Sequence, residues 1–169
     1  MPADTYVYEL LDVAVHDRAA FHCGVDALDR YLHRQARQDM SNHVATVYIQ
    51  RTVDAPTILG YYSISNLSIE ARDLAPALAK RLPRYPILPA TLIGRLAVDQ
   101  SQRGKGLGGL LLFDAMSRSL RTSIASLAVV VDAKDDNARA FYAHYGFQRL
   151  GGHEGRLHLP SKDIEALAP

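Results

Sequence analysis

The spacing of apolar residues changes along the chain and divides its first half into predicted strands and helices. Apolar side chains recur at three- and four-residue intervals over about residues 25–40, which predicts a helix with one face on a core. A first strand is expected at 6–11. Segments 45–50 and 57–64 are rich in β-branched and aromatic residues and flank a turn, so they predict a β-hairpin. The helix residues expected to face the core are Val25, Leu28, Leu32 and Ala36.

Strands and helices alternate in the second half of the chain. A strand near 92–99, a helix over 106–120, a strand near 126–132 and a helix over 137–145 predict a βαβα unit. Because a helix joins the two strands, they are expected to be parallel. Three shorter elements complete the prediction: a helix over 74–81 capped by Asp73, a closing hairpin from 147–150 and 156–159, and a helical tail over 162–167.

Composition limits the class of protein. The chain has 169 residues, 48% of them hydrophobic, which predicts a single domain over 1–169 with a full core. A net charge of +1 gives the whole molecule no bias toward nucleic acid or membranes, so such binding would need local patches. The lone Cys23 is expected to be a buried thiol, and no metal-ligand spacing occurs. Without a leader-like or membrane-spanning segment, the protein is expected in the cytoplasm.

A glycine-rich segment separates the strand near 92–99 from the helix over 106–120. Such a loop points backbone N–H groups at one small volume and the next helix adds its positive dipole end, which favours a phosphate or pyrophosphate ligand. A dinucleotide motif with Asp132 as its ribose acid is rejected because fewer than about forty residues follow Asp132. A P-loop is rejected because no Lys-Ser or Lys-Thr pair closes the loop. The candidate phosphate-binding residues are Arg103, Gly104, Lys105, Gly106, Leu107, Gly108 and Gly109.

Two motifs resemble the GCN5-related N-acetyltransferases (GNATs). From Arg103 the loop reads R-x-x-G-x-G, and the run from Asn137 through Phe141-Tyr142 to Gly146-Phe147 is similar to the family's second signature. The resemblance implies an α/β (mixed α+β) fold with a central mixed sheet of about six to seven strands flanked by helices. It also implies acetyl-CoA as cofactor, in a cleft beside residues 92–120. Tyr142 would protonate the departing thiolate, or else simply pack its helix on the sheet.

The same resemblance assigns further cofactor contacts. The backbone of Leu96, Ala97 and Val98 would pair with the pantetheine arm in the manner of an added strand, while their side chains are expected in the core. Asn137 would either contact the arm or cap the last helix.

The similarity extends over nearly the whole chain to the acetyltransferase toxins of bacterial type II toxin–antitoxin systems. It is carried by residues 21–32, 86–99 and 131–134. It implies acetylation of the α-amino group of aminoacyl-tRNA and a block of translation. The implied partners are a ribbon-helix-helix antitoxin, operator DNA together with that antitoxin, and a second copy of the chain.

Acid–base chemistry independently favours an α-amine as the group that accepts the acetyl. Many lysine acetyltransferases place a carboxylate base on the strand before the loop, whereas here Asp99 at its far end is the only acid. Deprotonating a lysine at pH 7 costs about 4.6 kcal/mol, but an α-amine of pKa about 7.7 costs only about 1 kcal/mol. A base from elsewhere, such as Glu70, would remove this preference.

Several basic residues are candidate substrate contacts, with an ordinary solvated surface as the alternative. Arg95 stands on an apolar strand and would either orient substrate or form a structural pair. Two other functions stay open: acetylation of small amines or protein N-termini, and a CoA-binding or DNA-bound regulatory role. The other candidate tRNA contacts are Arg30, Arg34, Arg37, Lys80, Arg81 and Arg84.

Overall fold

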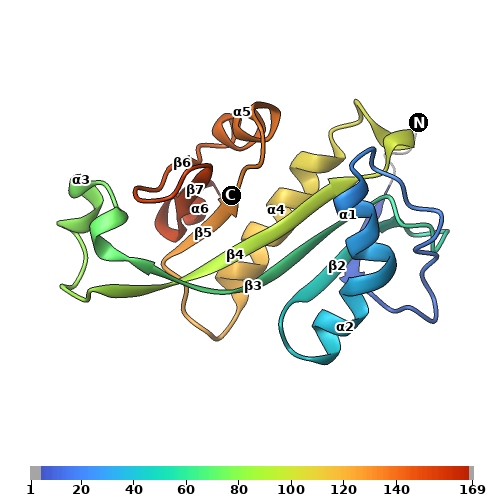
Figure 1. Cartoon of the computed structure of the whole chain (residues 1–169), viewed down its shortest axis with the longest axis horizontal. Coiled ribbons are helices and arrows are strands. Elements are labelled where there is room, and N and C mark those ends of the chain that lie inside the picture. Colours follow the sequence, from blue (N-terminus) through green and yellow to red (C-terminus); the bar gives the residue numbers. More distant parts are fainter. Residues whose placement is uncertain (1–4, 168–169) are drawn as a thin grey trace. The chain divides into compact units, whose positions relative to one another are not determined.

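The computed structural model describes residues 5–167 and has a mixed α/β fold (Figure 1). Within these described residues, seven strands form one sheet in the order β1-β2-β3-β4-β5-β7-β6, which confirms the expected mixed sheet. The strands are β1 (Tyr6–Leu10), β2 (Thr46–Thr52), β3 (Gly60–Glu70), β4 (Ile87–Val98), β5 (Ala128–Asp132), β6 (Gln148–Arg149) and β7 (Arg156–Pro160). The helices are α1 (Asp26–Arg30), η1 (Tyr31–Gln35), α2 (Ala36–Ser41), η2 (Ala71–Asp73), α3 (Pro76–Ala79), η3 (Gln100–Gln102), α4 (Leu107–Arg121), α5 (Asp136–His144) and α6 (Ser161–Leu167).

The chain forms two compact units that interleave in sequence. The first combines residues up to 65 with 94–115, and the second combines 66–93 with the residues from 116 onward. The elements β3, β4 and α4 each cross a boundary, so they contribute residues to both units.

An antiparallel β1–β2–β3 arrangement forms the sheet of the first unit. Tyr6 lies opposite Thr52, and Thr46 lies opposite Ile64, which confirms the predicted hairpin. Its core combines strand residues with the helices and the turn before them. The buried members are Leu11, Phe21, Cys23, Tyr31, Leu32, Ala36, Val47, Ile49, Ile58, Tyr61 and Ala97.

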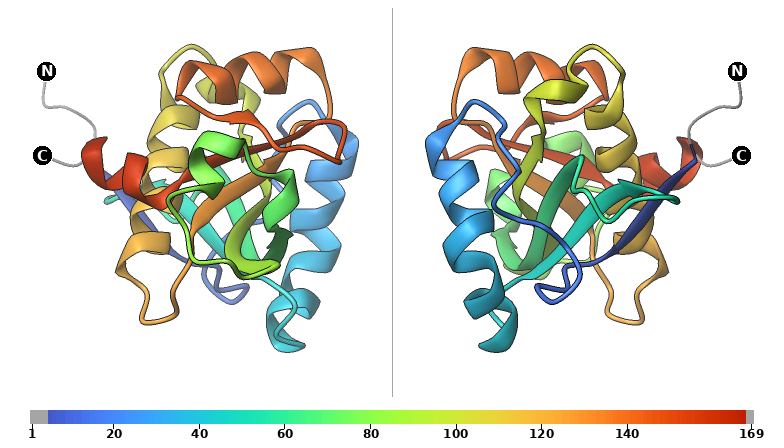
Figure 2. Two further views of the ribbon diagram at one scale, coloured as in Figure 1. Left: turned by 90° about the vertical axis from the view of Figure 1, so that its left-hand side faces the viewer. Right: turned by 90° about the vertical axis from the view of Figure 1, so that its right-hand side faces the viewer.

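The predicted helix over 25–40 is present, but its centre is a π-helix. The segments α1, η1 and α2 join end to end into one rod (Figure 2). The wider π turn places the consecutive residues Tyr31 and Leu32 both in the core. Val25 was expected there but is 37% exposed, because it precedes the first helical turn with an extended backbone.

The second unit contains the parallel pair. Strands β4 and β5 run parallel from Thr91 opposite Val129 to Ile93 opposite Val131, with α4 as the crossover, which confirms the βαβ prediction. β5 is also paired with β7, and β7 with β6, both antiparallel, so the closing hairpin is confirmed. The buried core comprises Ile69, Leu74, Leu88, Ala90, Val130 and Leu150.

The cap predicted at Asp73 is wrong. Asp73 ends the 3-10 turn η2, whereas the cap position of α3 is Ala75, which has no side-chain hydrogen bond. The carbonyl of Asp73 instead accepts from the Gly151 N–H at 2.9 Å, and its carboxylate faces His153 at 3.7 Å. The Asp73 side chain therefore faces a residue far away in the sequence instead of capping the helix that follows it. No helix within residues 5–167 is both long and apolar enough to cross a bilayer.

Candidate functional site

The glycine loop lies between the end of β4 and the start of α4, as predicted. Gly104 and Gly106 have φ of +79° and +77°, which any residue with a Cβ adopts only with strain. A Cβ built at either position meets no protein atom within 4 Å, so the space beside this backbone is open. An open nest of backbone N–H groups ahead of a fifteen-residue helix suits a phosphate group.

Asp99 fastens the start of the loop. Its carboxylate accepts the Ser101 N–H at 2.9 Å and the His22 N–H at 3.0 Å, while the Gln100 N–H donates to the His22 carbonyl at 2.8 Å. Burial raises the pKa of Asp99, but these N–H donors outweigh it and hold the pKa below its ordinary value. Asp99 is therefore an ionised structural acceptor.

Arg103, which directly precedes the first loop glycine, is bound to the same turn. Its Nη2 donates to the Cys23 carbonyl at 3.1 Å. Gly24 has φ of +88°, and a Cβ there would lie 2.5 Å from that Nη2. Asp29 holds the turn from the other side by accepting the Cys23 N–H at 2.8 Å. The Arg103 side chain thus anchors the loop, which leaves its backbone for a ligand.

The strand segment before the loop packs tightly on β3. Ala97 is buried, as expected, whereas Leu96 and Val98 are only half-buried. A Cβ on Gly60 would lie 3.0 Å from the Ala97 carbonyl oxygen and 2.6 Å from Leu111 Cδ1. Glycine at position 60 therefore permits the close approach that fixes this part of β4.

Arg95 takes part in an aromatic contact that sequence reasoning did not anticipate. Its guanidinium carbon lies 3.6 Å from the ring centre of Tyr31. The Tyr31 hydroxyl donates to Asp39 at 2.9 Å, and its ring stacks on Tyr61 at 6.3 Å. Burial, followed by the hydrogen bond to Asp39, raises the pKa of Tyr31 to about 12. Neither a carboxylate nor a carbonyl among the described residues pairs with Arg95.

Tyr142 lies on α5 in an aromatic cluster of the second unit. Its ring centre is 5.1 Å from that of Phe141 and 5.4 Å from that of Phe147. Burial raises its pKa to about 12, so the hydroxyl stays protonated at neutral pH. No described residue hydrogen-bonds that hydroxyl. The ring therefore packs in the aromatic cluster of α5, and its hydroxyl carries a proton at neutral pH.

The capping role considered for Asn137 is wrong. The cap residue of α5 is Asp135, whose carboxylate accepts the Ala138 N–H at 2.8 Å. Asn137 is an exposed residue of the first turn. An ionised carboxylate at this position is also favoured by the helix dipole.

The basic candidates form two exposed sets. One lies on the α1–η1–α2 rod and the other on and just after α3. In the part of the chain that the structure describes, none of the six takes part in an ion pair. Both the solvated and the ligand-binding interpretation fit this placement. The sets are Arg30, Arg34 and Arg37, and Lys80, Arg81 and Arg84.

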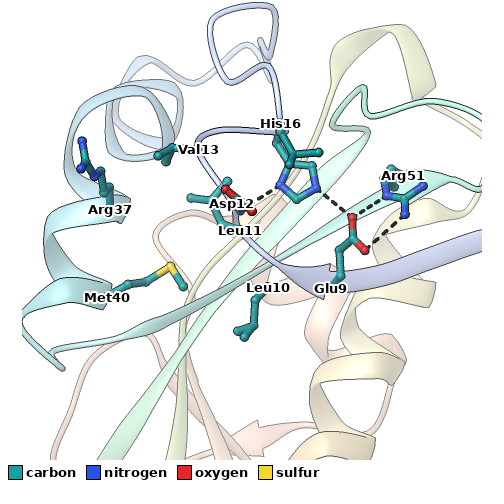
Figure 3. A pocket seen from close by; sticks show the side chains of 10 residues that line it. Glu9, Leu10, Leu11, Asp12, Val13, His16, Arg37, Met40 and Arg51 are labelled. Carbon is teal, nitrogen blue, oxygen red and sulfur yellow. Dashed lines mark hydrogen bonds and ion pairs between the residues drawn. The ribbon is translucent and has the colours of Figure 1, made fainter.

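A pocket of about 720 Å³ adjoins β1, and no pattern in the sequence predicts it. Glu9 bridges Arg51, at 2.5 Å, and the buried His16, at 2.8 Å (Figure 3). The His16 Nδ1 accepts the Asp12 N–H at 2.9 Å, so Nε2 carries the proton donated to Glu9. Arg37 lies on the opposite wall (Figure 3). Glu9, Arg51 and His16 satisfy one another, so this network is structural.

Comparison with known proteins places the chain in a family. Residues 87–158 match the model of the acetyltransferase (GNAT) domain. The chain is 32% identical over 170 residues to the probable toxin TacT of Sinorhizobium fredii, covering 95% of this chain and 94% of TacT. It is 35% identical over 156 residues to the tRNA-acetylating toxin of Mycobacterium tuberculosis, covering 89% and 90%.

Solved structures extend the similarity to complexes. AtaT complexed with acetyl-methionyl-tRNAfMet is 32% identical, with a TM-score of 0.86 over 96% of this chain and 99% of that one. AtaTR bound with acetyl-CoA is 32% identical, with a TM-score of 0.81 over 97% and 98%. A tyrosine-to-phenylalanine AtaT toxin bound to the C-terminus of the antitoxin AtaR is 30% identical, with a TM-score of 0.79 over 97% and 98%. The chain therefore belongs to the GNAT acetyltransferases, in the family of acetyltransferase toxins that includes TacT and the tRNA-acetylating toxin.

Proposed function

We propose that the protein transfers the acetyl group of acetyl-CoA to the α-amino group of an aminoacyl-tRNA and so acts as a toxin that blocks translation. The observation that carries the proposal is the open, anchored glycine loop at the start of α4, in a chain that matches tRNA-acetylating toxins over most of its length. Bound acetyl-CoA supplies a thioester that an amine can attack.

The residues of the first unit fit the donor. The N–H groups of the loop over 103–109 and the dipole of α4 bind the pyrophosphate. The backbone of Leu96, Ala97 and Val98 holds the pantetheine arm, and Gly60 keeps that segment fixed. In the second unit, Asn137 does not cap α5, and we expect its side-chain amide to contact the arm.

Asp99, the acid at the far end of this strand, is a poor base, and this supports an α-amine as acceptor. Asp99 is held ionised by two N–H donors, which compete for the lone pairs a proton would need. Without such a base, deprotonating an α-amine of pKa about 7.7 at pH 7 costs only about 1 kcal/mol, whereas deprotonating a lysine costs about 4.6 kcal/mol. Tyr142, protonated at this pH, donates a proton to the departing thiolate.

The test is transfer of labelled acetyl from acetyl-CoA to a mixed pool of aminoacylated tRNA. We expect label on charged tRNA and none on deacylated tRNA. Tyr142→Phe should lower the rate about 10²- to 10⁴-fold with acetyl-CoA binding retained, because only the proton donor is lost. Tyr145→Phe is the matched control and should keep the wild-type rate. Transfer to free amines but not to charged tRNA would instead select the small-amine or N-terminal acetyltransferase.

The partners follow from the same assignment. We expect a ribbon-helix-helix antitoxin to neutralise the enzyme and to bring it to operator DNA, and AtaT bound to the C-terminus of AtaR supports an antitoxin contact. We also expect a homodimer in the cytoplasm, where charged tRNA is found. Light scattering on the purified protein should give twice the mass of the chain.

A further inference from the structure

Arg95 differs from the other half-buried arginines of the first unit because no described residue accepts a hydrogen bond from it. Arg51 is paired with Glu9 at 2.5 Å, and Arg18 donates to the Leu32 carbonyl at 3.2 Å. Arg95 is also half-buried, yet no described residue accepts any of its five N–H donors. The contact with the Tyr31 ring offsets only part of the cost of withdrawing the charge from water.

The ring beneath Arg95 is held rigidly. The Tyr31 hydroxyl donates to Asp39 Oδ2, and the other oxygen of Asp39 accepts from Gln35 at 2.9 Å. Tyr61, which stacks on Tyr31, donates its own hydroxyl to the Leu28 carbonyl at 2.7 Å. The carboxylate of Asp39 is thus used by two other groups, and Tyr31 cannot turn away. The guanidinium is positioned before any ligand arrives.

Local backbone structure supports a functional reason for this arrangement. Tyr31 is the first residue of the π segment η1, and single π turns inside α-helices are frequent at functional sites. Arg95 immediately precedes the strand segment 96–98, which we assign to the pantetheine arm. An unpaired, oriented guanidinium therefore stands at the strand where acetyl transfer is proposed.

We propose that Arg95 binds a backbone phosphate of the acceptor end of the aminoacyl-tRNA and positions its amine for transfer. The inference rests on the proposed function and names the substrate group that this residue recognises. A full positive charge without a counterion favours an anion over a neutral carbonyl, and the guanidinium fork matches two phosphate oxygens. In an aminoacyl-tRNA the anions are the phosphodiesters, of which one adjoins the terminal nucleoside that carries the ester.

Arg95→Gln and Arg95→Lys test the inference on a mixed pool of charged tRNA. Arg95→Gln should raise KM about 10- to 100-fold and reduce the slope of log affinity against log salt by about 1, because one phosphate contact is lost. Arg95→Lys should lie between Arg95→Gln and wild type, since it keeps the charge without the fork. Acetyl-CoA affinity should not change. Arg121→Gln, at the exposed end of α4, is the charge-matched control and should behave as wild type.

A substrate without phosphate shows whether Arg95 binds a phosphate oxygen or the carbonyl oxygen of the aminoacyl ester. Acetylation of methionine methyl ester should be the same in wild type and Arg95→Gln if the contact is a phosphate. An equal loss on the ester and on charged tRNA, or a loss of acetyl-CoA affinity, would overturn the inference, as would an unchanged KM and salt slope for charged tRNA. Absence of transfer to charged tRNA by the wild type would refute the proposed function instead.

Discussion

At the scale of single residues, the ionisation of Glu9 makes the stability of the fold depend on pH. Hydrogen bonds from Arg51 and from His16 lower its pKa to about 2. A carboxyl group whose pKa is lower in the folded than in the unfolded chain stabilises the fold above the unfolded value of 4.5. That stabilisation is lost as the pH falls from about 4.5 toward 2. Because Glu9 is 34% exposed, its contribution is modest.

Glu9→Gln should lower the free energy of unfolding by about 1 kcal/mol at pH 7. Urea titrations at several pH values should show this difference shrinking between pH 4.5 and 2, where wild-type Glu9 becomes protonated. Glu165→Gln, an exposed position on α6, is the control and should stay within about 0.5 kcal/mol of wild type throughout. A difference independent of pH would show that the ionisation of Glu9 is not its source.

At the scale of elements, the loop depends on a turn far away in the sequence. The turn over 21–24 receives hydrogen bonds from Arg103 and Gln100, and its own His22 N–H is accepted by Asp99. The ligand-facing backbone is therefore shaped by contacts that do not touch the ligand. A change in the turn should act on the affinity for acetyl-CoA.

Gly24→Ala should weaken acetyl-CoA binding about tenfold or more, because the new Cβ would meet Arg103 at 2.5 Å and the backbone has φ of +88°. Isothermal titration calorimetry measures this directly. The matched control is Gly152→Ala, in the second unit, where φ is +76° and a Cβ would lie 2.8 Å from Asp73 Oδ1. Both variants should lose stability. Equal acetyl-CoA affinities in the two would contradict an anchoring role for the turn.

At the scale of the whole molecule, the sequence predicted structure that depends on local patterns but not contacts between distant segments. The hairpin, the parallel pair and the glycine loop followed from periodicity and composition, which act over a few residues. The π turn at Tyr31 was invisible because a wider turn leaves no distinct apolar pattern. The ion pair of Glu9 with Arg51 and the hydrogen bond from Arg103 to the Cys23 carbonyl join residues far apart in the sequence, so no local pattern predicts them.

The interleaved units predict that the chain folds only when intact. The first unit combines residues up to 65 with residues 94–115, which follow the first segment of the second unit. The second unit combines residues 66–93 with residues from 116 onward, so residues 94–115 of the first unit lie between its two parts. Cutting between 93 and 94 also divides β4. Purified fragments 1–93 and 94–169 should each lack dispersed amide signals in NMR spectra, whereas the intact chain should show them. A folded isolated fragment would contradict this prediction.

The turn over 21–24 also contains a thiol whose reactivity should depend on acetyl-CoA binding. Cys23 is the only cysteine of the chain, is buried, and offers its carbonyl to Arg103. Alkylation of its thiol requires the turn to open, and opening removes a restraint on the loop. Saturating acetyl-CoA should therefore slow modification by iodoacetamide, followed by mass spectrometry. The rate of labelling would then report cofactor occupancy without any introduced probe.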